Sequence, residues 1–145
     1  MHKLSVRFSR LGDARKIHLI PIEKDLPLNS IKYDILSKQT IIATFYNKVV
    51  GILRFEYLWK SQPFMNLIYV EESYRNNGVG KKLLAYLEKY LKKKGFRYLF
   101  SSSSECTNNS CNWHEKVGFK PCGTVDKLNL PDSSSKEIFF YKKLP

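Results

Sequence analysis

The sequence is poor in the residues that build disulfide-stapled or zinc-stabilised proteins. It has three cysteines, Cys106, Cys111 and Cys122, and no CxxC pair. An odd number of thiols at these spacings predicts neither a disulfide framework nor the paired ligands of a structural zinc site. We therefore expect free thiols, no bound metal and a reducing, cytoplasmic setting.

Long apolar runs are absent as well. No segment approaches the roughly 20 apolar residues that a membrane-spanning helix needs. The first residues lack the pattern of a signal peptide, and there is no internal repeat. The length suits a single domain over residues 1–145, and a hydrophobic fraction of 43% is typical of a folded chain. We expect no membrane partner.

Acidic residues are few. The chain has 13 Asp and Glu against 25 Lys and Arg, which gives a formal net charge of +12. Such a surface attracts polyanions such as nucleic acid, anionic lipid or a phosphate-rich cofactor. The sequence contains no zinc finger, aromatic RNA-binding motif or capped basic recognition helix, and its lysines are dispersed. This argues against a nucleic-acid partner, although a basic nucleic-acid-binding protein stays an alternative.

The apolar pattern predicts an α/β domain with one mixed sheet. Residues 64–70 form a nearly continuous apolar run, typical of a central strand. In residues 80–94, Leu83, Leu84, Leu87 and Leu91 share one helical face, and lysines occupy other faces. The other expected strands are residues 4–8, 96–103, 136–144, a stretch after Pro121 and a hairpin within 40–59 that turns at 46–48. The other expected helices are residues 13–19, 29–38 and 108–117, and a turn is expected at 131–135.

A short loop, "YRNNGVG", joins the central strand to the helix of residues 80–94. A helix N-terminus leaves backbone N–H groups unpaired and carries partial positive charge, so it binds anions. Asn and Gly reach left-handed conformations at low cost, which lets such a loop fold around a phosphate. A strand-to-helix turn that needs glycine for geometry alone is an equally good interpretation of these residues by themselves.

Two motifs carry a resemblance to a known family. The stretch "VEESYRNNGVGKKLL", from Val70 to Leu84, resembles the acetyl-CoA-binding motif of the GNAT acetyltransferases, [RQ]-x-x-G-x-[GA]. Further along, "NWHEKVGF", from Asn112 to Phe119, is similar to the second signature of that family. The order of strands around both motifs also fits. The resemblance therefore covers nearly the whole chain and implies a single GNAT-like domain, a mixed central sheet flanked by helices.

The resemblance implies an acetyl-CoA-dependent N-acetyltransferase that moves an acetyl group directly to a primary amine. In similar enzymes the pantetheine arm runs along the end of the central strand, and the thioester lies in a V-shaped gap beside the next strand. Backbone amides of the loop hold the pyrophosphate. Many relatives are dimers, so a homodimer is also expected. The implied cofactor-binding residues are Leu67, Ile68, Tyr69, Val70, Arg75, Asn76, Asn77, Gly78, Val79, Gly80, Lys81 and Asn109.

The chain departs from the family pattern at three positions. Asn76 replaces a frequent glycine, which positive φ at asparagine tolerates. The position of a frequent helix-opening asparagine falls on Thr107, although Asn108 and Asn109 are adjacent. His114 replaces the tyrosine credited in the family with protonating the departing thiolate. Imidazole titrates near neutrality, so His114 is a candidate proton donor. The alternative is a buried residue that fills the tyrosine space.

A base must also deprotonate the incoming ammonium group. Glu56 is the candidate, since it should face the middle of the central strand across the hairpin. An exposed glutamate paired with Arg54 or Lys60 is an equal alternative.

The remaining candidates have less support. We expect Glu71 and Glu72 to be solvated, Asn66 to offer only a hydrogen bond and Cys106 to be buried packing. Trp59, Trp113, Tyr57 and Phe64 are expected in the core or a pocket wall. An acetyl-CoA-binding module without efficient catalysis is the second alternative function.

Overall fold

The computed structural model describes residues 3–104, 108–126 and 136–145. Its helices are η1 (Leu11–Asp13), α1 (Ala14–His18), α2 (Leu28–Leu36), η2 (Glu72–Tyr74), α3 (Val79–Lys93) and α4 (Asn108–Lys116). Its strands are β1 (Leu4–Phe8), β2 (Thr40–Phe45), β3 (Lys48–Leu58), β4 (Gln62–Val70), β5 (Tyr98–Ser104), β6 (Lys120–Asp126) and β7 (Lys136–Lys143).

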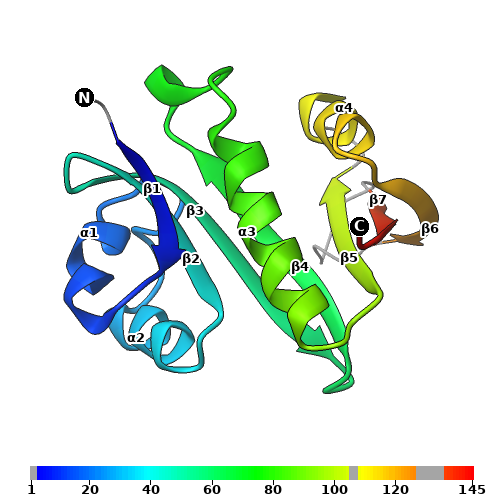
Figure 1. Ribbon diagram of the computed structural model, residues 1–145, viewed down its shortest axis with the longest axis horizontal. Coiled ribbons are helices and arrows are strands. Elements are labelled where there is room, and N and C mark those ends of the chain that lie inside the picture. Colours follow the sequence, from blue (N-terminus) through cyan, green and yellow to red (C-terminus); the bar gives the residue numbers. More distant parts are fainter. Residues whose placement is uncertain (1–2, 105–107, 127–135) are drawn as a thin grey trace.

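The strands form one mixed sheet in the order β1-β2-β3-β4-β5-β7-β6. Every neighbouring pair is antiparallel except β4 and β5, which run parallel through the α3 crossover. Figure 1 shows α3 lying across the sheet in front of β4, with β4 and β5 diverging toward the end where α3 begins. The predicted α/β class and mixed sheet are confirmed.

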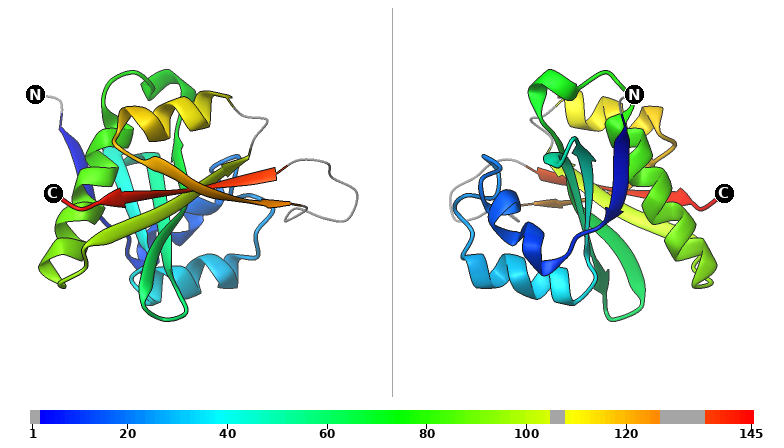
Figure 2. Two further views of the ribbon diagram at one scale, coloured as in Figure 1. Left: turned by 90° about the vertical axis from the view of Figure 1, so that its right-hand side faces the viewer. Right: turned by 60° about the vertical axis from the view of Figure 1, so that its left-hand side comes forward.

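Helices cover both faces of the sheet (Figure 2). On one face, Leu83, Leu87 and Leu91 of α3 pack on Leu53 and other inward residues of β2 to β5, and α4 joins the same cluster. On the other face, α1 and α2 bury a smaller isoleucine-rich cluster against β2 and β3. Alternate side chains of the central strands therefore have apolar partners on both sides, which explains their continuous apolar runs.

Most predicted elements are found within one or two residues. The α3 face of Leu83, Leu84, Leu87 and Leu91 is buried as expected. Gly95 and Gly118 adopt φ of 93° and 99°, the left-handed conformation that ends helices. Cys111 and Cys122 are free thiols. The predicted turn at 131–135, Cys106 and Thr107 lie outside the described residues.

One prediction about aromatic residues is wrong. Trp59 is 86% exposed at the tip of the β3–β4 hairpin, whereas we expected it in the core or a pocket wall. Trp59 and Lys60 occupy the two central positions of a tight turn, with φ of 50° and 63°, and this turn projects the indole away from the sheet. Tyr57, Phe64 and Trp113 are partly buried, as expected.

Ion pairs hold α2 and the segment before it against β3. Arg54 of β3 forms ion pairs with Glu23 at 2.5 Å and Asp34 at 3.2 Å. Glu23 is 1% exposed, and a buried carboxylate persists only where a cation compensates it.

Across the described residues, no helix is long and apolar enough to cross a bilayer.

Candidate functional site

The sheet opens between its two parallel strands. Pairing of β4 with β5 is confined to Phe64 with Phe100 and Met65 with Ser101. At the next residue the register of β4 on β3 shifts, because Arg54 pairs with Leu67 and Phe55 with Met65. Asn66 is thus the extra residue of a β-bulge, which bends a strand and increases its twist. Beyond Met65 and Ser101 the two strands diverge in a V, and we call the separation between them the gap (Figure 1).

The loop before α3 has the conformation of an anion site. Asn76 and Gly78 have φ of 64° and 78°, and Gly78 is the residue that precedes α3. The first α-helical bond at this end runs from Lys82 N to Gly78 O, so the N–H groups of residues 79–81 precede the helical ladder. A Cβ built on Gly78 would meet no atom within 4 Å. The backbone here faces open space.

Cationic side chains surround this loop. Lys81 and Lys82 are exposed in the first turn of α3. Arg75 donates from Nε to the carbonyl of Val70 at 2.8 Å, and its guanidinium lies 5.6 Å from the centre of the Tyr69 ring. Arg75 therefore ties the loop to the end of β4 and keeps its charge beside the helix N-terminus.

The start of α3 lies against α4 at Gly80. A Cβ at this position would lie 3.5 Å from Cζ2 and Nε1 of Trp113, an ordinary van der Waals contact. The indole of α4 thus forms one wall of the loop. Asn109, predicted to bind the cofactor, is exposed in the first turn of α4.

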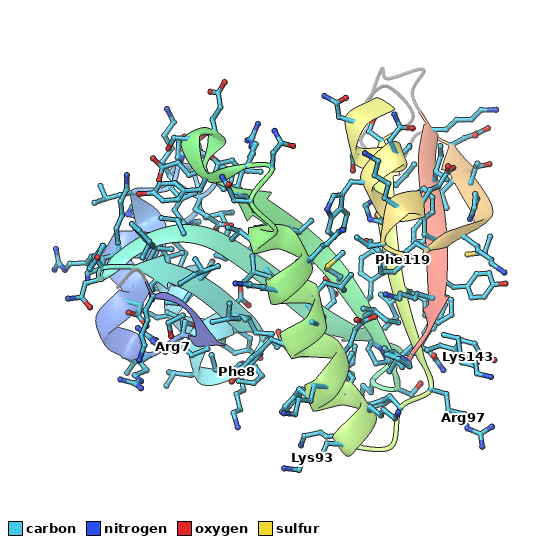
Figure 3. All side chains as sticks on the ribbon, turned by 45° about the horizontal axis from the view of Figure 1, so that its top comes forward. Arg7, Phe8, Lys93, Arg97, Phe119 and Lys143 are labelled. Atoms are coloured by element: carbon cyan, nitrogen blue, oxygen red, sulfur yellow. The ribbon has the colours of Figure 1, made fainter. Side chains whose placement is uncertain are left out.

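His114 is a buried residue at the closed end of the gap. It is 2% exposed, and its ring stacks on Phe140 with a centroid distance of 4.7 Å and packs edge-on against Phe119. Figure 3 shows Phe119 where the chain leaves α4 to rejoin the sheet. Nε2 lies 2.8 Å from Ser101 Oγ, and Nδ1 lies 2.7 Å from the carbonyl oxygen of Ser110.

These contacts determine where the imidazole carries its hydrogen. A carbonyl only accepts, so Nδ1 is the donor to Ser110, and in the neutral ring Nε2 accepts the hydroxyl hydrogen of Ser101. Ser101 Oγ also lies 3.1 Å from the carbonyl of Met65. If Nε2 gains a proton, Ser101 can turn its hydrogen to that carbonyl. Burial lowers the pKa of His114 from 6.5, although the Ser110 bond and Glu137 oppose this.

Glu56 lies on the opposite face of the sheet, beside the bulge. It is exposed on β3, pairs in register with Phe64 and accepts a hydrogen bond from Asn66 at 2.5 Å. It faces the start of the 64–70 run, not its middle as predicted. The hairpin turn sets this register, because the pairing runs without a break from Leu58 with Gln62 to Glu56 with Phe64. Its partner is Asn66, whereas the alternative interpretation named Arg54 or Lys60.

A second carboxylate lies near Glu56. Burial raises the pKa of Asp34, the charge of Arg54 opposes the shift, and the charge of Glu56 adds to it. Glu71 forms an ion pair with Lys48 at 2.9 Å, whereas we expected a solvated charge without a partner. Glu72 is exposed, as expected.

A groove of about 470 Å³ adjoins the end of β4 on the α1 side of the sheet. It is lined mainly by apolar side chains, with Tyr69, Lys48 and Glu71 among its polar ones. No cluster of three or more His, Cys, Asp or Glu side chains arranged to hold a metal occurs in the part of the chain that the structure describes.

The structure brings most of the predicted site residues together, and it adds others. Residues 67–70, the loop and the start of α3 surround the mouth of the gap, and His114 lies at its base. Sequence reasoning missed Ser101 as the partner of His114 and Asn66 as a bulge. The alternation of Leu99, Ser101 and Ser103 marks two serines as inward-facing, but it does not identify the side chain opposite them.

Comparisons with known proteins agree with this arrangement. Residues 14–119 match the family described as "Acetyltransferase (GNAT) family". An acetyltransferase of the GNAT family from Bacillus cereus is 25% identical over 99% of both chains, with a TM-score of 0.80. The ribosomal-protein-S18-alanine N-acetyltransferase from Escherichia coli is 15% identical over 99% of this chain and 94% of its own, also with a TM-score of 0.80.

A third structure, from Bacillus anthracis, is described as a streptothricin acetyltransferase in complex with acetyl coenzyme A. It is 25% identical over 73% of this chain and 62% of its own, with a TM-score of 0.67. No curated protein matches the sequence at a significant level.

The buried imidazole predicts a pH dependence of stability. The pKa of His114 is lower in the folded state, so below about 6.5 the unfolded chain binds a proton that the folded chain does not. The free energy of unfolding should therefore fall as pH decreases from 7.5 to 5.5, and His114→Gln should reduce that fall. Urea titrations of both proteins across this range measure the difference. Equal slopes for the two proteins would contradict the assignment.

Proposed function

Because the chain belongs to the GNAT acetyltransferase family, we propose that it transfers the acetyl group of acetyl-CoA directly to the primary amine of an acceptor. The observation that supports the proposal is that two features lie side by side at the start of α3. An anion-binding helix N-terminus lies next to a gap between parallel strands, so a ligand with phosphates at one end and a narrow arm at the other matches both.

The loop fits the phosphates of this cosubstrate. Left-handed backbone at Asn76 and Gly78 and unpaired N–H groups at residues 79–81 form a concave donor surface. The open space at Gly78 admits a bulky group, and Lys81 and Arg75 add positive charge. In this proposal Asn77, Val79 and Gly80 contribute backbone, and Asn109 approaches from α4.

The gap fits the arm. Beyond Met65, the side of β4 that faces β5 has no strand partner in the described pairing, so Leu67, Ile68, Tyr69 and Val70 present backbone groups there. Amides of an extended arm can replace the missing strand, as peptides do when they add to a sheet edge. When bound, acetyl-CoA supplies an acetyl carbonyl for attack by the amine and a thiolate that takes up a proton as it leaves.

Glu56 is the proposed general base. Its carboxylate lies on the α1–α2 face beside the bulge, and Asn66 orients it through a single hydrogen bond. Since it is exposed, it can take a proton from an ammonium group directly or through one water molecule. In this proposal the acceptor enters from the α1–α2 face, where the groove beside β4 lies. The cosubstrate enters from the opposite face, which carries α3 and α4.

His114 is the proposed proton donor. In its protonated form Nε2 donates to Ser101 Oγ, whose hydroxyl lies at the base of the gap and can pass a proton into it. Ser101 thus connects a buried imidazole to the site where the reaction takes place. A protein that binds acetyl-CoA without efficient turnover is the second candidate. The burial of His114 and its lowered pKa favour it, because both reduce the protonated fraction near neutral pH.

The acceptor class is left open by the comparisons. One similar structure is named for streptothricin and another for an alanine of a ribosomal protein. An acceptor panel should therefore contain small amines, amino acids, aminoglycoside-like antibiotics and peptides with a free N-terminus. Release of the CoA thiol detects turnover with any of them. Binding of acetyl-CoA with no turnover across the panel would favour the second candidate.

Gly80 tests the phosphate cradle. Gly80→Asp should abolish acetyl-CoA binding, since it adds a negative charge to the first turn of α3, beside the N–H groups that bind the phosphates in this proposal. Gly80→Ala is the matched control, because its Cβ meets Trp113 only at ordinary contact distance, and it should bind acetyl-CoA within a few-fold of the parent. Calorimetry on folded protein measures both. A Gly80→Asp protein that binds at parental strength would refute the cradle. Substitution of Gly78 is a poorer test, since its positive φ strains any side chain.

Glu56 tests the base. Glu56→Gln keeps the size and a hydrogen bond to Asn66 but cannot accept a proton, so kcat should fall by roughly 10²-fold. The dissociation constant of acetyl-CoA should be unchanged, because the two sites lie on different faces. Glu72→Gln, at another exposed glutamate, is the control and should be fully active. Unaltered kcat in Glu56→Gln would remove this residue from the proposal.

His114 tests the proton donor. His114→Ala should lower kcat by roughly 10²-fold with little effect on acetyl-CoA affinity, and His114→Tyr should retain substantial activity. A purely structural role predicts a large loss of melting temperature from the cavity and near-normal turnover of the folded fraction. Measuring melting temperature and kcat for both variants separates the two roles.

A further inference from the structure

The end of the molecule where α3 finishes is strongly basic. It is built from residues 57–63, 89–98, 116–121 and 140–145, which together we name the basic end. None of these segments contains an aspartate or a glutamate. Their cationic residues are Lys60, Lys89, Lys92, Lys93, Lys94, Arg97, Lys116, Lys120, Lys142 and Lys143.

The fold brings these segments together. Tyr98 pairs with Lys143, and Leu144 N donates to the carbonyl of Arg97 at 2.8 Å. Lys120 pairs with Tyr141, which places β6 at the same edge. Tyr57, near the tip of the β3–β4 hairpin, packs on Phe96 with a centroid distance of 5.7 Å. Lysines that are dispersed in the sequence therefore share one surface.

Three of these charged side chains point into solvent. Figure 3 shows Lys93, Arg97 and Lys143 projecting outward at this end. Among the described residues, none of these three forms an ion pair, whereas Lys142 is held by Glu88 at 2.6 Å. Lysines in the last turn of α3 offset the helix dipole. That role does not extend to Arg97 or Lys143, which lie beside and within strands.

Aromatic side chains accompany the charges. Tyr98 and Tyr141, with ring centroids 6.3 Å apart, line a hollow of about 310 Å³ together with Lys120 and Lys143. Trp59 stands at the hairpin tip, 86% exposed, and no ring contact involves it among the described residues. The surface thus offers flat π-faces among unpaired cations.

The hairpin tip is held in an unfavourable conformation. Trp59 and Lys60 both have positive φ, which costs conformational energy for residues with a Cβ, and Asn-Gly is the sequence that such turns prefer. The indole gains little packing in return for this strain. A strained, exposed aromatic residue beside a cationic surface points to a role in contact with another molecule.

We propose that the basic end binds single-stranded nucleic acid. Proteins that hold single strands combine a cationic surface for the phosphates with aromatic rings on which bases stack, and the stacking tolerates any base sequence. Lys93, Arg97 and Lys143 take the phosphate role. Trp59, Tyr98 and Tyr141 take the stacking role.

This surface is separate from the acetyl-CoA site. The helix α3 has 15 residues, about 22 Å at 1.5 Å each, and it carries the phosphate cradle at one end and the basic end at the other. Acetyl-CoA should therefore not displace the nucleic acid, and both should bind together. Competition between them would mean that the oligonucleotide occupies the cradle, which would overturn the proposal.

The charge test uses a 20-nucleotide oligouridine and filter binding over a range of salt. The triple variant Lys93→Gln, Arg97→Gln, Lys143→Gln should bind at least tenfold more weakly at low salt. Each lost phosphate contact lowers the slope of log K against log salt by about 0.7, so the slope should fall by about 2. The control, Lys3→Gln, Lys24→Gln, Lys32→Gln, removes the same charge from exposed lysines elsewhere. Equal losses in both variants would overturn the proposal.

The stacking test separates binding from folding. Trp59→Asn with Lys60→Gly relieves the turn and should raise the melting temperature by roughly 4–8 °C. The same variant should bind oligouridine about tenfold more weakly. The control, Tyr46→Asn with Asn47→Gly, makes the same change in the β2–β3 hairpin, where φ is 49° and 67°, and should leave oligonucleotide binding unchanged. Full binding by the Trp59 variant would overturn the stacking role.

Two further probes define the partner. A blunt duplex of the same length hides its base faces and should bind more weakly than the single strand. Vesicles of phosphatidylserine present charge without bases. Binding to vesicles but not to oligouridine, or to neither, would overturn the proposal.

Discussion

The early end of pairing between β4 and β5 is the constraint from which the site follows. Two residue pairs join the parallel strands, and the bulge at Asn66 then turns β4 away. A continuous ladder would satisfy the backbone of Leu67 to Val70 within the sheet and leave no room between the strands. Ser101 lies at the base of the gap, with its Oγ 3.1 Å from the carbonyl of Met65. The opening therefore results from the strand pairing of the sheet itself.

A pair of buried polar side chains lies at the base of the gap. Ser101 and His114 are almost fully buried. Ser101 donates to Nε2 of the neutral imidazole, and Nδ1 of His114 donates to the carbonyl of Ser110. An unpaired polar group in this position would cost about 1–3 kcal/mol, so the pair is stable only as a unit. The same unit holds a titratable nitrogen next to the gap, and this couples the stability of α4 to the chemistry that we assign there.

The sequence predicted features whose causes are local. The amphipathic face of α3, its glycine stop and the loop with positive φ depend on neighbouring residues, and each was found. The sequence did not predict features that depend on contact with a distant segment of the chain. The bulge at Asn66 comes from the register of β4 on β3, and the bond of His114 comes from the packing of α4 on β5. The gathering of lysines at the basic end likewise depends on strand order. The exposure of Trp59 has a local cause, the turn geometry of residues 59 and 60, but the aromatic character of the residue does not reveal it.

The contact between Gly80 and Trp113 gives the protein a built-in optical reporter. The chain has two tryptophans. Trp59 lies in water, so its emission is that of a solvated indole and hardly depends on what α3 binds. Trp113 is half-buried against the first turn of α3, where a phosphate or a shifted backbone changes the electric field at the indole. The two tryptophans therefore lie near opposite ends of α3 and in different surroundings. The emission at shorter wavelength belongs to Trp113, at the end of α3 that carries the loop.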